Sequence, residues 1–387
     1  MKSTPYIKST RVLGAALTAA AMLLPSGKSA LADAAPEKGI VAYKFLNYRD
    51  SQPGQERMNI NVSTIRVMTP IAGKWAIDVV GANDFITGAS PHFHNYIPTD
   101  SVTGASKLRH DTRRSIDLNV TRYFSSGSVT AGTSYSQESD YISRSYSLQS
   151  SISTPNKNTT VTFGGSITKD SINPNNLRTY SDQKKIYSAL VGLTQVMSKN
   201  DIVQVNLSRS IGSGYYTDSY RVFDERPRHR NYTTVLSRWN HYFDSTEGAS
   251  RLSYRYYTDT FGIKAHTFSA EYVQPLPQGF TITPSVRLYS QTAASFYVPI
   301  GPDEIEYPDS PSDYGSATFY SEDQRLSAYG AVTLAFKVSK RFADSWLVDV
   351  RYDHYMQRGH WAISGTPDSN LLAFNADFIQ LGLSKEF

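Results

Sequence analysis

The chain has 387 residues, among them 27 Tyr, 17 Phe and no Cys, and its mean hydropathy is −0.40. The negative hydropathy excludes a protein built from membrane-spanning helices, and the lack of Cys excludes disulfides, thiolate metal sites and covalent c-type haem. The formal net charge of +5 is small for a nucleic-acid-binding protein, and the N-terminal residues account for most of it.

Residues 1–32 have the pattern of a secretory signal peptide. Lys2, Lys8 and Arg11 precede an apolar run over 12–24, and Ala30-Leu31-Ala32 forms a small-x-small cleavage site. The segment carries four basic residues and no acid, so its removal leaves 35 Lys and Arg against 34 Asp and Glu. The mature chain, 33–387, is nearly neutral, and we expect no nucleic-acid partner.

Beyond the signal peptide, apolar and polar residues alternate in segments of about ten residues, which predicts β-strands and no helix. The connections are alternately short and long, as in bacterial barrels with short periplasmic turns and long extracellular loops. We predict an all-β fold, a transmembrane antiparallel β-barrel of about 16 strands; a large soluble sandwich or propeller is the alternative. The expected strands are 40–48, 58–67, 74–81, 111–124, 128–138, 141–153, 159–168, 184–197, 201–210, 231–243, 249–258, 264–273, 280–290, 325–339, 345–356 and 372–387.

The C-terminal segment is typical of the closing strand of an outer-membrane barrel. Ile379, Leu381, Leu383 and Phe387 lie on one side of a two-residue repeat, and the chain ends on that aromatic residue. Such an ending is read by the barrel-assembly machinery, so the predicted partners are this machinery and outer-membrane lipid, and the predicted location is the outer membrane.

Charged residues on the polar faces of the expected strands are predicted to line the lumen, because Arg or Lys facing lipid near the midplane costs about 2–4 kcal/mol. They form either a selectivity filter of opposed charges or a mutually neutralising network that stiffens a closed barrel. The predicted lumen-facing charges are Asp78, Asp117, Arg251, Arg255, Glu271, Arg287, Lys337, Asp349, Arg351 and Asp353.

An Asp-x-x-Thr-Gly-Ala-Ser motif occurs twice, over 84–90 and 100–106, and we expect both copies in one extracellular loop, 82–110. The hard oxygen donors could hold Ca²⁺ or fold the loop into a plug, and we predict a folded loop without a metal. Nearby His92, His94 and His110 are expected to be surface residues. The motif residues are Asp84, Thr87, Gly88, Ser90, Pro91, Asp100, Thr103, Gly104 and Ser106.

The acidic loop 302–323 either binds divalent cations or is solvated, and no spacing of Ser, His and acid indicates a catalytic site. No residue pattern indicates a cofactor.

The chain resembles the bacterial family called domain of unknown function thirty-five seventy. The resemblance rests on Tyr48-Arg49-Asp50, Glu56-Arg57-Met58, the motif that ends in Thr-Gly-Ala-Ser-Pro at 87–91, and Arg113. It implies an outer-membrane barrel whose gene often lies beside those of a small lipoprotein, a thioredoxin-like protein and a flavin transferase. A small lipoprotein or periplasmic redox protein is therefore an implied partner, and the family implies no catalytic residue.

Three functions follow as hypotheses. The first is a channel-like barrel whose loop 84–110 narrows or plugs the lumen. The second is a non-enzymatic docking scaffold for a periplasmic or lipoprotein partner in an extracytoplasmic flavin or redox system. The third is an outer-membrane hydrolase, which we disfavour because no nucleophile and base are paired in the sequence.

Overall fold

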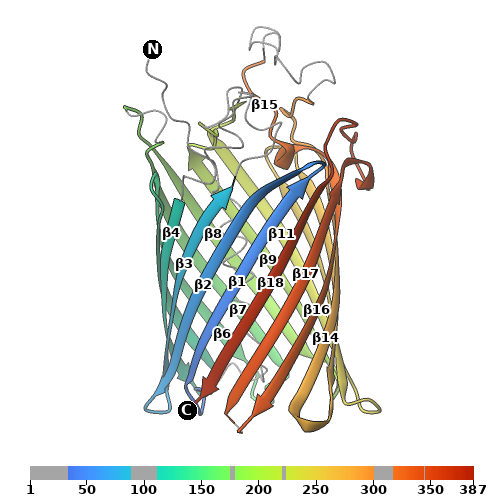
Figure 1. The fold of residues 1–387 in the computed structure, drawn as a ribbon. Coiled ribbons are helices and arrows are strands. Elements are labelled where there is room, and N and C mark those ends of the chain that lie inside the picture. The colour runs from blue at the N-terminus through green and yellow to red at the C-terminus, as the bar shows by residue number, and fades with distance from the viewer. Residues whose placement is uncertain (1–33, 89–110, 175–178, 220–223, 300–316, 344) are drawn as a thin grey trace.

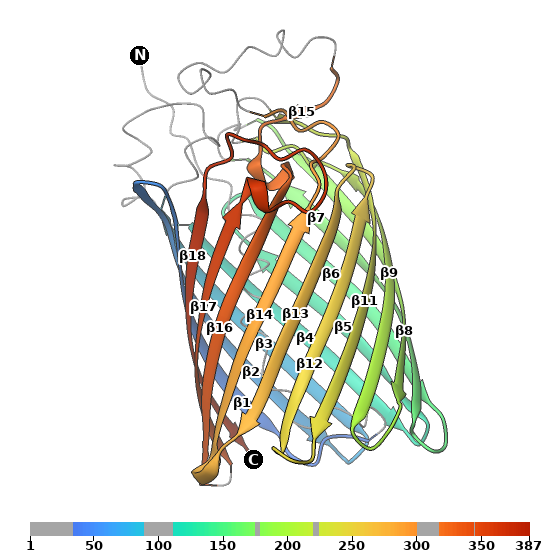
Figure 2. The same cartoon turned by 90° about the vertical axis from the view of Figure 1, so that its right-hand side faces the viewer.

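The computed structural model describes residues 34–88, 111–174, 179–219, 224–299, 317–343 and 345–387. The predicted signal peptide lies outside them. Sixteen antiparallel strands form one closed barrel, which confirms the predicted fold and strand number (Figures 1 and 2). The barrel strands are β1 (Ile40–Gln52), β2 (Gln55–Ile71), β3 (Trp75–Gly88), β4 (Asp111–Phe124), β5 (Gly127–Gln137), β6 (Tyr141–Ser153), β7 (Thr159–Ile172), β8 (Asp182–Val196), β9 (Asp201–Gly214), β11 (His229–Phe243), β12 (Gly248–Asp259), β13 (Lys264–Pro275), β14 (Phe280–Gln291), β16 (Tyr329–Phe342), β17 (Trp346–Arg358) and β18 (Phe374–Glu386).

The remaining elements are short. The strands β10 (Asp224–Glu225) and β15 (Tyr320–Ser321) pair with each other above the barrel, and single 3-10 turns lie at η3 (Pro277–Gly279), η4 (Gln324–Leu326) and η5 (Gly359–Trp361). In the described part of the chain, no helix is long and apolar enough to cross a membrane.

The barrel closes where β1 pairs with β18, from Ile40 opposite Glu386 to Ser51 opposite Asn375. Beyond this ladder the Gly39 amide donates to the Phe387 carbonyl at 2.8 Å, and the Phe387 amide donates to the Gly39 carbonyl at 3.0 Å. Because the number of strands is even, the first and last strands meet antiparallel like every other pair. No barrel strand has an unpaired edge.

The wall has an apolar outer face and a largely polar inner face, because successive side chains of a strand point to opposite sides. On β6, for example, Tyr146 and Leu148 lie outside and are 56% and 59% exposed. Ser147 and Gln149 lie inside and are also exposed. An exposed apolar outer face of this kind is the lipid-facing surface of a transmembrane barrel.

Connections differ between the two ends of the barrel. At one end, lowest in Figure 1, each holds at most five residues, and we call it the turn end. The opposite end, the loop end, carries every long connection, but 53–54, 138–140 and 260–263 are tight there too. The expected sorting of connections by length is therefore incomplete.

The sequence predicts a connection over 49–57 between the first two strands. In the structure β1 and β2 both extend into this segment and leave only 53–54 as the turn. The Tyr48 hydroxyl and the Met58 amide donate to the Asp50 carboxylate at 2.7 and 3.1 Å, and Arg57 lies 3.5 Å from the same carboxylate. These contacts hold the Asp50 carboxylate inside the barrel, and β1 and β2 extend to a tight turn at Gly54, whose φ is +75°.

One part of the inner face is an apolar cluster. On β1, β2 and β18 near the loop end, the inward positions pack together, and the outward positions are polar. The Asn47 amide, for instance, donates to Asn59 and Asn61 at 2.8 Å on the outer face. The cluster consists of Leu46, Tyr48, Met58, Ile60, Val62, Phe374 and Ala376.

Candidate functional site

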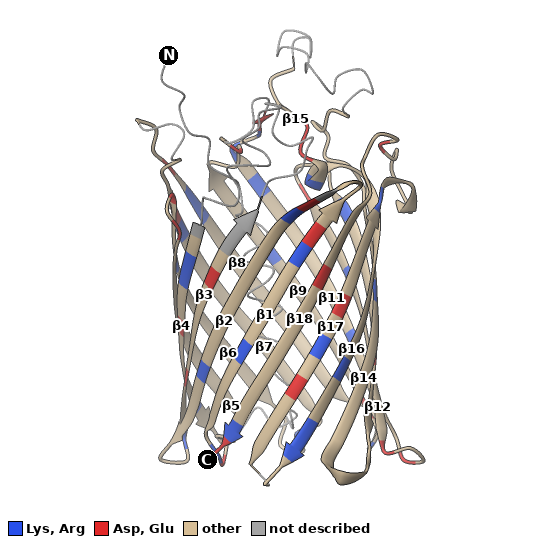
Figure 3. Cartoon of the chain, viewed as in Figure 1, with Lys and Arg blue, Asp and Glu red and all other residues tan. Residues whose placement is uncertain are grey.

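The structure places all ten charged residues of the predicted lumen on the inner face, opposite exposed apolar neighbours. Arg287 lies beside Leu288, which is 44% exposed on the outer face, and Asp117 lies between Ile116 and Leu118. Charged residues of both signs occur along the strands as well as in the loops (Figure 3). Their alternation with apolar residues follows from the two-residue repeat of a strand.

Five of these ten charges form an ion pair with a neighbouring side chain. Arg66 binds Asp78 through two hydrogen bonds of 2.8 Å. Arg251 pairs with Glu271 at 2.9 Å, and Arg351 pairs with Asp353 at 2.7 Å. Lys337 is two strand positions from Asp349 on the inner faces of β16 and β17. The hypothesis of a neutralising network therefore describes a large part of the inner wall.

Arg255 and Arg287 lie outside these ion pairs. In the described part of the chain, neither forms an ion pair with a carboxylate. Arg255 lies over the Tyr257 ring at 5.4 Å, and Arg287 is exposed on the inner face of β14. Arg251 and Arg238 lie on the same wall, formed by β11 to β14. This arginine wall carries positive charge that its own side chains do not cancel.

The neighbouring wall, formed by β5 to β9, is neutral and built from small side chains, and it meets the arginine wall where β9 pairs with β11. Across β6 to β9, hydroxyl pairs join neighbouring strands: Ser145 with Thr168 at 3.1 Å, and Ser188 with Ser210 at 2.8 Å. Because β6 is exposed on both faces at 146–149, solvent reaches its inner side at mid-strand. The inner side chains of this wall include Ser134, Ser136, Ser143, Ser145, Ser147, Gln149, Thr162, Ser166, Thr168, Ser188, Asn206 and Ser208.

The motif region differs from the expected loop. Asp84, Thr87 and Gly88 belong to β3, which runs seven residues beyond its predicted end. Asp84 is 1% exposed and pairs with Arg113 on β4 at 2.8 Å through both Nε and Nη2. This buried ion pair extends the β3–β4 pairing, which is why the strand continues. The positions Ser90, Pro91, Asp100, Thr103, Gly104 and Ser106 lie outside the described residues, as do His92, His94 and His110.

Six of the residues that carry the family resemblance are buried on the inner side of β1 to β4, near the loop end, whereas Arg49 and Glu56 are exposed and 89–91 lie outside the described residues. Tyr48, Asp50 and Arg57 form one buried group, and Asp84 with Arg113 forms another. Burial of a charge requires a partner, so each group holds its acid and its arginine in contact. These contacts stabilise the wall of the barrel.

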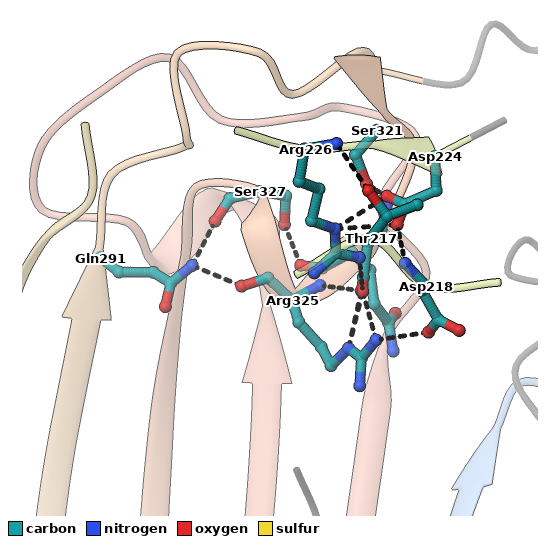
Figure 4. A network of polar contacts seen from close by, with 10 residues as sticks. Thr217, Asp218, Asp224, Arg226, Gln291, Ser321, Arg325 and Ser327 are labelled. Atoms are coloured by element: carbon teal, nitrogen blue, oxygen red, sulfur yellow. Dashed lines mark hydrogen bonds and ion pairs between the residues drawn. The ribbon is translucent and has the colours of Figure 1, made fainter. Parts of the chain in front are cut away.

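At the loop end, two long connections are joined by a charged network that the sequence did not reveal (Figure 4). Arg226 donates from Nε to Asp224 and from Nη2 to Asp323, both at 2.9 Å. Arg325 pairs with the same Asp323 and, at 3.1 Å, with Asp218. We call these five residues the loop clamp. It connects residues 215–228 with 317–328.

The loop clamp is buried and its charges depend on one another. Burial raises the pKa of the Asp224 carboxyl, although the Arg226 guanidinium opposes the shift. Burial alone would lower the pKa of Arg226, but attraction to Asp224 and Asp323 outweighs it and raises that pKa. Because Asp323 is fully buried between two arginines, it is an ion-pair partner and not a cation ligand of the acidic loop.

An apolar cluster and a strand-end amide support the clamp. Phe261, Ile263, Phe296 and Leu326 pack together at the loop end. The Gln291 amide at the end of β14 donates to the carbonyls of Arg325 and Ser327 at 2.9 and 2.7 Å (Figure 4). The 292–328 connection is thereby fixed to the barrel at its C-terminal part.

Three of the five histidines in the described residues bond to aspartate or tyrosine. His241 contacts Asp201, His266 contacts Tyr254, and His354 contacts Asp377. All three lie on the outer face, and in the described residues no serine hydroxyl bonds any of these three imidazoles. In the same residues, no group of three or more His, Asp or Glu could hold a metal ion.

Several solved structures are similar to this chain. One is a bacterial polysaccharide outer membrane secretin, with a TM-score of 0.49 and 8% identity over 90% of this chain and 98% of that chain. OccD3 (OpdP) of Pseudomonas aeruginosa has a TM-score of 0.44 and 9% identity over 92% and 93%. The CymD monoaromatic hydrocarbon channel has a TM-score of 0.44 and 8% identity over 91% and 89%. No curated protein matches the chain in sequence.

A family model matches the chain in sequence. It covers residues 14–378, and this range contains every residue on which the resemblance rests, from Tyr48 to Arg113. The chain therefore belongs to the family described as Protein of unknown function (DUF3570).

Proposed function

We propose that the mature chain forms a water-filled pore in the outer membrane, after export by the predicted signal peptide, and that the pore favours small anionic solutes. The observation that carries the proposal is the contrast between two neighbouring walls of the lumen. Among the described residues, Arg255 and Arg287 lie on one wall without an ion pair to a carboxylate, and the adjoining strands β5 to β9 present small hydroxyl side chains that leave solvent on the inner side. A positive wall beside water raises the local concentration of anions.

The test is the reversal potential of the refolded mature protein in a planar bilayer under a KCl gradient. We expect the wild type to prefer chloride, and the double variant Arg255→Gln/Arg287→Gln to lower the anion-to-cation permeability ratio by about twofold or more. The matched control is Arg114→Gln/Arg209→Gln, which removes the same charge from exposed positions on the outer face of β4 and β9. An unchanged reversal potential in the lumen variant would refute anion preference.

Within the predicted loop 84–110, the connection 89–110 that follows β3 is the proposed plug of this pore. Deleting residues 89–110 leaves the buried pair Asp84–Arg113 on its two strands, so the deletion spares the described wall. Conductance that appears or rises after deletion supports the plug. If the intact protein conducts steadily and the deletion does not change its conductance, the protein is an open pore without a plug.

No catalytic reaction or cofactor is part of this proposal. The docking scaffold, with a small lipoprotein or periplasmic redox protein as partner, is the alternative that the same experiment separates. A correctly folded barrel that is silent both before and after the deletion would leave docking as its function.

A further inference from the structure

Three basic residues lie side by side on the outer face of the barrel, on adjacent strands near the loop end. Arg144 on β6 is directly opposite Lys169 on β7, and Lys169 is directly opposite Lys185 on β8. All three are exposed. Side chains opposite each other in an antiparallel pair have their Cβ atoms about 4.5–5.5 Å apart, so this basic row concentrates three positive charges within two strand spacings.

The basic row lies just beyond the apolar belt. The next outward position on each strand toward the turn end is occupied by Tyr146, Ile167 and Tyr187, which form the next cross-strand row. The two tyrosines are 56% and 51% exposed. Tyrosine is enriched at the headgroup level of membranes, so the basic row is placed where lipid headgroups begin.

The charges of the row are not neutralised by the protein. In the described residues, no carboxylate forms an ion pair with Arg144, Lys169 or Lys185, and Arg144 only stacks over the Tyr135 ring at 5.6 Å. The adjacent residue Lys184 shows the contrast: it points inward and pairs with Asp170 at 3.1 Å. Like charges directly opposite one another destabilise a sheet, so the row has a cost that an external anion would remove.

The outer face across the barrel is different near the loop end. There β1, β2 and β18 present Asn47, Asn61 and Asp377, and the exposed Arg49 lies directly opposite Asp377. Arg114 on β4 and Arg209 on β9 are the exposed basic residues on either side of the row. Near the loop end, exposed basic residues are therefore more closely spaced on the β4–β9 side of the outer face than around Arg49 on β1 or Lys264 on β13.

We propose that the basic row Arg144–Lys169–Lys185 binds the phosphate groups of a phosphorylated lipid headgroup in the outer leaflet. Charge complementarity selects phosphate, since an arginine and two lysines can each donate charge-assisted hydrogen bonds to its oxygens. The position beside the tyrosines selects a lipid headgroup over a free anion. The proposal requires that the barrel lie in a membrane, and it is independent of whether the barrel conducts.

The test measures binding of lipid A to the folded mature barrel in a neutral detergent, by native mass spectrometry. We expect the wild type to bind the bisphosphorylated form, and the triple variant Arg144→Gln/Lys169→Gln/Lys185→Gln to bind it at least about tenfold more weakly. Lys199→Gln, which removes an exposed lysine at the turn end, is the matched control and should bind as the wild type does.

Two further ligands identify the source of the phosphate, and one conservative variant guards against misfolding. Dephosphorylated lipid A should bind the wild type no better than it binds the triple variant. Inorganic phosphate should not displace lipid A at equal concentration, and displacement would assign the row to a free anion and overturn the headgroup proposal. The variant Lys169→Arg/Lys185→Arg keeps the charge and should keep binding. Equal binding of bisphosphorylated lipid A by the wild type and a folded triple variant would also overturn the proposal.

Discussion

The pair Asp84–Arg113 shows how one buried contact fixes the ends of two strands. The Asp84 carboxylate is almost fully buried on the inner face of β3, and Arg113 on β4 contacts it with two nitrogens. A buried carboxylate that loses its partner retains the cost of desolvation without the compensating attraction. The pair is therefore a sensitive point for the stability of the barrel.

At this scale we predict that Arg113→Gln lowers the free energy of unfolding by about 3–5 kcal/mol. Urea unfolding in phospholipid vesicles measures the change. Arg251→Gln is the control, because the Arg251 side chain is 44% exposed and its pair with Glu271 should contribute at most about 1 kcal/mol.

A double-mutant cycle distinguishes the ion pair from general packing. Asp84→Asn/Arg113→Gln removes both charges, so the double variant should be more stable than the sum of the two single changes predicts. If the changes in the free energy of unfolding of the two single variants add up to that of the double variant, the two residues contribute separately.

Among the elements, the long connections at the loop end depend on the loop clamp more than on regular structure. The strands β10 and β15 are two residues each, and they pair only at Asp224 with Ser321 and Glu225 with Tyr320. The arginines of the clamp therefore provide most of the attachment between 215–228 and 317–328.

We predict that Arg226→Gln releases this attachment, because Asp224 and Asp323 would remain buried without their shared guanidinium. Limited proteolysis of the folded barrel should then cut within 215–228 or 292–328 at least about tenfold faster than in the wild type. Arg228→Gln is the control, since Arg228 is 55% exposed and pairs with Asp182 at the start of β8 and not with a residue of the clamp. Equal cleavage rates for the two variants would mean that the clamp does not hold the loops.

The whole molecule depends on the seam between β1 and β18, which converts a twisted sheet into a closed wall. Ala42 lies opposite Ser384 on the inner face, and Tyr43 lies opposite Leu383 on the outer face. Directly opposite residues in an antiparallel pair have Cα separations within the range that a disulfide bridges.

We predict that Ala42→Cys/Ser384→Cys forms an intramolecular disulfide on oxidation, because the chain has no other cysteine and both side chains point inward. Gel mobility of the unfolded chain with and without reductant measures it. The control Ala42→Cys/Leu383→Cys places the two thiols on opposite faces and should not cross-link within one barrel. A disulfide in neither variant would contradict the closed seam.

The sequence by itself determined the architecture. Alternation from 40–48 to 372–387 is a local property, since each residue's face follows from its position in the strand. Sixteen strands require the last to pair with the first, and the terminal segment around Leu381 and Phe387 has the pattern of a closing strand. The inward side of Asp78, Arg287 and the other lumen charges follows from the same repeat.

Only the tertiary structure decided which charges meet. Asp84 and Arg113 are 29 residues apart, and Arg226 and Asp323 are 97 apart, so no local pattern joins them. The repeat also does not distinguish the paired Arg251 from the unpaired Arg255, because partners come from neighbouring strands and loops. For the same reason β3 continues through Gly88: burial of Asp84 against Arg113 overrides the turn-forming residues that follow.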